Sequence, residues 1–87
     1  MADDEKRYAR QLMGKTVVTK TGKRFGEVDN LTFEVRTGEL LQLILRNATG
    51  YAEGLNLEKD GKGNFLIPYS SVMAIVDFIV VAEEDII

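Results

Sequence analysis

The sequence contains no cysteine and no histidine. Without cysteine the chain has no disulfide, no thiolate zinc site and no cysteine nucleophile. Without histidine it lacks the commonest general base and metal ligand. These absences predict a protein that is not an enzyme and that binds neither a metal nor a cofactor.

Long hydrophobic runs are also missing. No stretch reaches the roughly 18 to 20 apolar residues that cross a bilayer, and the first 13 residues have no apolar signal-peptide core. The 87 residues, 45% hydrophobic and 29% charged, are typical of one small globular domain. We therefore expect a cytoplasmic protein without membrane insertion, in which contacts with a partner supplement a small core.

The formal net charge is −3, and the charges are unevenly distributed. Residues 14–50 hold six basic and four acidic residues, whereas residues 51–87 hold two basic and seven acidic ones. A net negative chain is a poor general binder of nucleic acid, because phosphate contacts need a dense basic face. Four basic residues near the first turn are nevertheless a candidate basic patch, with a solvated hairpin as the favoured alternative: Lys15, Lys20, Lys23 and Arg24.

The order of residue types predicts an all-β protein. Acidic residues occupy positions 3–5 of the segment 1–13, which is typical of an arm or a short helix. β-branched and aliphatic residues then recur in short runs separated by turn residues. The runs predict six strands near residues 16–19, 25–35, 40–46, 65–67, 72–76 and 78–81. We expect residues 14–87 to form a single domain, a small and partly open β-barrel.

The second predicted strand contains a change of phase. Gly26 and Val28 occupy one phase, whereas Leu31 and the apolar residues after it occupy the other. Because side chains alternate strictly along a strand, this slip predicts an extra residue near Asp29 and Asn30. Such a residue is a β-bulge, which bends a strand.

The segment from Asn47 to Asn64 is rich in glycine and polar residues. It has few candidate core positions, so we expect a long and mobile connection with a short element near residues 55–57. Within it, residues 60–64 resemble a calcium loop only superficially, since Lys62 stands where a ligand oxygen is required. A turn is the favoured interpretation there.

The last two predicted strands, between Val72 and Val81, are apolar in both phases. A half-exposed strand would alternate with polar residues, so one face of this hairpin needs a second cover. Another copy of the chain is the favoured cover, and the N-terminal turn with Tyr8, Leu12 and Met13 is the alternative. The candidate self-association interface is Met73, Ile75, Phe78, Ile79 and Val81.

The sequence resembles the PRC-barrel family over nearly its whole length. The resemblance consists of an ordered set of weak motifs: Leu12 to Val18, Thr21-Gly22-Lys23, Gly26-Glu27-Val28, Ile67 to Val72, and then Ile75, Asp77 and Ile79 to Val81. It implies a barrel that acts as a binding module and not as a catalyst. The chain looks most similar to the stand-alone archaeal members of the family.

Some archaeal members are cell-division adaptors. The resemblance therefore implies that this chain binds a SepF-like anchor of the FtsZ ring or a paralogous PRC-barrel protein. It also implies a homodimer or a hetero-oligomer that is recruited to the division site. The alternative is an accessory of RNA processing or ribosome assembly, which would use Lys15, Lys20, Lys23 and Arg24 against phosphate or a ribosomal protein.

Overall fold

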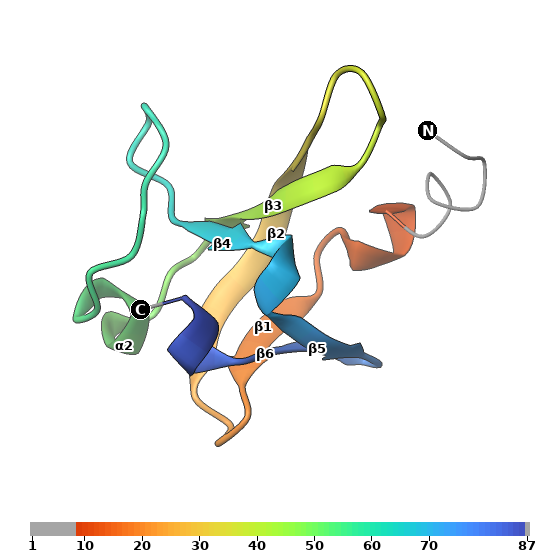
Figure 1. Ribbon diagram of the computed structural model, residues 1–87. Coiled ribbons are helices and arrows are strands. Elements are labelled where there is room, and N and C mark those ends of the chain that lie inside the picture. The colour runs from red at the N-terminus through yellow and green to blue at the C-terminus, as the bar shows by residue number, and fades with distance from the viewer. Residues whose placement is uncertain (1–8, 87) are drawn as a thin grey trace.

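The computed structural model describes residues 9–86, and most of these residues are in strands or in the turns that join them (Figure 1). Its six strands are β1 (Thr16–Thr19), β2 (Arg24–Phe33), β3 (Leu40–Arg46), β4 (Leu66–Pro68), β5 (Val72–Ile75) and β6 (Phe78–Val81). The helices are short. They are α2 (Gly50–Glu53) and the 3-10 turns η1 (Tyr69–Ser71) and η2 (Glu83–Asp85), and residues 9–12 form a helical turn.

The strands form one sheet in the order β4-β3-β2-β1-β6-β5. All neighbouring pairs are antiparallel except β1 and β6, which are parallel. The six predicted strands and the β-rich fold are confirmed. The sheet is not closed into a barrel, because β4 and β5 stay at its two edges and η1 connects them.

The predicted bulge in β2 is confirmed. Val28 pairs with Leu45 and Asn30 pairs with Ile44, so Asp29 is the extra residue between two consecutive partners on β3. A second irregularity falls between Thr32 and Phe33. The ten-residue β2 and its partner β3 project beyond the other strands as a long hairpin (Figure 1).

The core draws on almost every element. Leu12 from the helical turn is fully buried there, together with residues from β1, β2, β3, β4 and β6. The second and third strands contribute Phe25, Val28, Leu43 and Leu45. Tyr8, which we considered as part of a cover for the terminal hairpin, lies outside the described residues. Leu12 is core rather than a cover of the hairpin's outer face.

The connection after β3 contributes two residues to the core. The side chain of Thr49 caps α2 by accepting a hydrogen bond from the Ala52 amide (3.2 Å), and Ala52 is fully buried. Leu57 is also buried. These two are the buried residues of the segment 47–64, and its helix lies at Gly50–Glu53 instead of near residues 55–57. The mobility of this segment stays a prediction.

Residues 60–64 form a turn, as the sequence predicts. The Asp60 carboxylate accepts hydrogen bonds from the backbone amides of Lys62 and Asn64, each at 2.9 Å. These bonds hold the pKa of Asp60 below its ordinary value, the Asn64 amide being the main cause. The Asp60 carboxylate thus stabilises its own loop by accepting hydrogen bonds from it.

Candidate functional site

The terminal hairpin has a buried face and an exposed face. In β6, Ile79 and Val81 are fully buried, whereas the Phe78 side chain is 50% exposed. The parallel register with β1 explains why Ile79 and not Phe78 is buried, because it places Ile79 beside the buried Val17. Ile79 and Val81 therefore belong to the core, which corrects their place in the predicted interface. A residue buried inside its own subunit cannot line a contact between subunits.

The exposed face of the same hairpin is apolar. Met73 is 57% exposed and Val76 is 64% exposed, while Ile75 is only partly buried and packs against the core. Met73 is the extra residue of a bulge between Val72 and Ala74. We define the outer patch as the four exposed apolar residues of this hairpin: Met73, Ala74, Val76 and Phe78.

A groove of about 540 Å³ adjoins the outer patch. Thr16, Val18, Gly22, Arg24 and Phe78 line it, so it runs over the outer side of β1 between β2 and β6. The register places Thr16 beside Phe78, and Val18 beside Arg24. The groove is apolar along β1, with one guanidinium at its β2 side. We refer to it as the β1 groove.

Three of the four basic residues of the candidate patch, Lys20, Lys23 and Arg24, lie at the turn between β1 and β2, and Lys15 lies at the other end of β1. Lys15 precedes β1 and donates a hydrogen bond to the carbonyl oxygen of Val76 (2.9 Å). Lys20 follows β1 and pairs with Glu84, which raises the pKa of Lys20 through that hydrogen bond. The four residues of β1 separate these two lysines by roughly 13 to 17 Å.

The other two basic residues lie at the start of β2. The Lys23 ammonium is 5.9 Å from the ring centroid of Tyr51, a cation–π distance. Arg24 borders the β1 groove. Lys20, Lys23 and Arg24 thus share one turn, and the RNA-related alternative stays a prediction.

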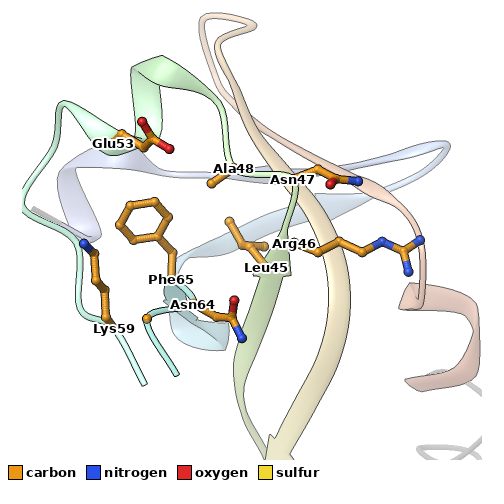
Figure 2. A pocket seen from close by; sticks show the side chains of 9 residues that line it. Leu45, Arg46, Asn47, Ala48, Glu53, Lys59, Asn64 and Phe65 are labelled. Atoms are coloured by element: carbon orange, nitrogen blue, oxygen red, sulfur yellow. The ribbon is translucent and has the colours of Figure 1, made fainter. Parts of the chain in front are cut away.

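A second cavity, of about 300 Å³, lies between the end of β3 and the loop before β4 (Figure 2). Phe65 lines it, and the Lys59 ammonium is 5.1 Å from the Phe65 ring centroid. Arg46 extends away from Phe65 and pairs outside the cavity with Glu27 (3.3 Å) and Asp29 (3.7 Å). Hydrogen bonds hold the pKa of Glu27 below its ordinary value, the larger effect coming from Asn47 and the next from Arg46.

One acidic and two basic residues line this second cavity. Its lining includes Glu53, Lys59 and two asparagines, but no pair of carboxylates and no hydroxyl beside a base. Across the part of the chain that the structure describes, no three acidic residues are grouped so as to hold a metal ion. Within residues 9–86 no helix has the length and apolar character needed to cross a membrane.

One exposed apolar surface, at the other end of β3 from this cavity, was not predicted from the sequence. Phe33, Val35 and Leu41 at the tip of the β2–β3 hairpin are 37%, 96% and 42% exposed. We call these three residues the hairpin tip. The sequence does carry a signal for the hairpin tip, because apolar residues continue up to the turn at residues 35–37.

Comparison with known proteins agrees with this architecture. A family model described as the PRC-barrel domain matches residues 4–86. The chain belongs to the PRC-barrel family. An uncharacterized protein of Methanocaldococcus jannaschii is 29% identical over 82 residues, which cover 94% of this chain and 88% of that protein. Membership of the PRC-barrel family points to a small domain of the interaction type.

Proposed function

We propose that this PRC-barrel protein is a non-enzymatic interaction module that associates with a second copy through the face containing the outer patch. The observation that carries the proposal is the exposure of Met73, Val76 and Phe78 on one hairpin at the edge of an open sheet. Contiguous exposed apolar residues at a sheet edge are typical of protein contacts and are an aggregation hazard when left uncovered.

The strength of the contact follows from how much of each side chain is still exposed. Fully burying one such side chain contributes roughly 1.5 to 3 kcal/mol, and about half of each remains to be buried here. Three residues then contribute on the order of 2 to 5 kcal/mol, against an association cost of about 4 kcal/mol or more. The outer patch alone gives weak binding, so a stable contact extends over the adjoining β1 groove.

At a finer level, the proposed role is that of an archaeal cell-division adaptor. The resemblance to stand-alone archaeal PRC-barrel proteins supports this role, as does a relative from an archaeon that is matched over most of its length. In this role the protein is recruited to the division site by a SepF-like anchor or a paralogous PRC-barrel protein. The support for the cell-division role is an analogy between members of one fold family.

Self-association is tested by sedimentation velocity over a range of concentrations. We expect the wild type to form oligomers, and we expect Phe78→Glu to be folded and monomeric. The matched control is Asn56→Lys, because Asn56 is exposed and lies in neither the outer patch nor the β1 groove. A wild type that stays monomeric at high concentration contradicts the proposal.

The cell-division role needs a separate experiment with defined components. Purified SepF-like protein and purified paralogue from the source organism are each titrated against the labelled chain. Saturable binding that Phe78→Glu weakens and Asn56→Lys does not weaken supports the adaptor role. Absence of binding to both proteins contradicts that role and leaves the self-association result unaffected.

A further inference from the structure

The hairpin tip is a two-stranded projection with no flanking strand. The neighbouring strand β4 pairs with β3 only at Gln42 to Ile44, and β1 pairs with β2 only up to Glu27. A two-stranded ribbon is marginally stable in water unless another element packs on it. Val35 is nevertheless 96% exposed, and Phe33 and Leu41 are more than one third exposed. The hairpin tip is therefore a convex apolar surface.

The β1 groove is the concave counterpart of this surface. Its volume of about 540 Å³ lies within the range of roughly 300 to 1,000 Å³ that is usual for binding pockets. Arg24 at the groove and Phe33 at the hairpin tip are the first and last residues of β2. Nine steps of about 3.3 Å put roughly 30 Å of strand between them. A copy cannot place its own hairpin tip in its own groove.

The charges of the two surfaces are complementary. The hairpin tip is flanked by Glu34, Arg36 and Glu39, so it has one more acidic than basic residue. Arg24 lines the β1 groove and forms no ion pair with another residue of the segment 9–86, although its charge is one of the causes that lower the pKa of Glu27. Glu39 also forms none within that segment. A hairpin tip placed in the groove brings acidic residues close to Arg24.

We propose that the hairpin tip of one copy docks into the β1 groove of a second copy, in a head-to-tail contact. This inference rests on the proposed self-association and names the element that fills the groove. Val35 and its neighbours cover Val18 and Phe78, and Glu34 or Glu39 approaches Arg24. Because the two contacting surfaces are different, each end of a two-copy complex keeps one free surface, and further copies can add.

Two variants separate head-to-tail docking from a symmetric contact. The tip variant combines Val35→Lys with Leu41→Lys, and the groove variant is Phe78→Glu. All three side chains are more than 40% exposed, so both variants should fold, which circular dichroism and thermal unfolding check. Asn56→Lys is the control for added charge on the surface.

Sedimentation velocity gives the readout. Wild type and Asn56→Lys should form species larger than a dimer as concentration rises. Each variant alone should be monomeric, its dissociation constant raised about tenfold or more. An equimolar mixture should form a dimer and nothing larger, because the intact tip of the groove variant fits the intact groove of the tip variant. Higher salt should weaken this dimer.

The possible failures are distinguishable. If the tip variant alone associates like wild type, the contact is a symmetric one between outer patches, and the head-to-tail inference is wrong while self-association stands. If both variants are monomeric and their mixture is also monomeric, the tip does not fill the groove, and the inference is again wrong. If wild type is monomeric at high concentration, both proposals fail together.

Discussion

The phenolic hydroxyl of Tyr51 in α2 donates a hydrogen bond to the carboxylate of Glu83 in η2. The same ring stacks on Phe25 of β2, with ring centroids 5.9 Å apart and an interplanar angle of 17°. The hydrogen bond to Glu83 raises the pKa of Tyr51, so the hydroxyl stays protonated and remains a donor. Tyr51 therefore connects the C-terminal turn to the first hairpin through a helix of only four residues.

Substitution Tyr51→Phe should loosen η2 without disturbing the sheet. It removes the hydroxyl and keeps the ring that stacks on Phe25. We expect faster hydrogen exchange at the amides of Asp85 and Ile86, which close η2, and unchanged exchange in β2 and β3. Tyr51→Ala should lower the melting temperature further, since it also removes the stack. Equal exchange in wild type and Tyr51→Phe would show that the hydroxyl does not hold the turn.

Gly26→Ala should destabilise the fold because two backbone segments meet at Gly26. An added Cβ would lie 2.8 Å from the carbonyl oxygen of Arg46 and 3.3 Å from Cα of Ala48. Overpacking of this kind costs about 1 to 3 kcal/mol. The matched control is Gly50→Ala in α2, where an added Cβ has no neighbour within 4 Å. Chemical denaturation should show a lower free energy of unfolding for Gly26→Ala and no loss for Gly50→Ala.

The bulge was predictable from sequence, whereas the buried face of the terminal hairpin was not. The bulge at Asp29 shows as a phase slip because the residues on either side of it are polar or apolar in a clear alternation. The strand Phe78–Val81 is apolar in both phases, so no pattern within it says which phase is buried. Its pairing with β1, some 60 positions earlier in the chain, decides that Ile79 faces the core.

The sequence pattern also did not predict how far strand length separates some residues in space. Lys15 and Lys20 are close in sequence, but β1 runs straight between them and places them at opposite ends. The hairpin tip is exposed because β4 has only three residues and ends before it reaches Leu41. Pro68 explains why β4 is short, since proline cannot donate to a strand ladder.

The loop at residues 60–64 should respond to acid. The pKa of Asp60 is lower in the folded protein than its ordinary value of 3.8. A depressed pKa means that the stabilising contribution is fully present above the unfolded value and is lost as pH falls through the folded value. We expect the amide proton signals of Lys62 and Asn64 to move together below pH 3.8.

The control for this titration is Asp60→Asn. The amide side chain keeps an oxygen that accepts the two backbone hydrogen bonds, but it has no charge to titrate. The amide signals of Lys62 and Asn64 in the variant should therefore not move over the same pH range. An unchanged titration in Asp60→Asn would show that a different carboxylate is responsible.

The two faces of the terminal hairpin should respond differently to truncation. Ile79 is fully buried beside Val17, so Ile79→Ala leaves a cavity and should lower the free energy of unfolding by about 2 to 5 kcal/mol. Met73 is 57% exposed, so Met73→Ala should change the free energy of unfolding by about 0.5 kcal/mol or less. Both are measured by chemical denaturation at a concentration where the wild type is monomeric. At high concentration Met73→Ala should instead weaken association, because its side chain belongs to the outer patch. A large loss of monomer stability in Met73→Ala would place Met73 in the core and remove it from the proposed contact.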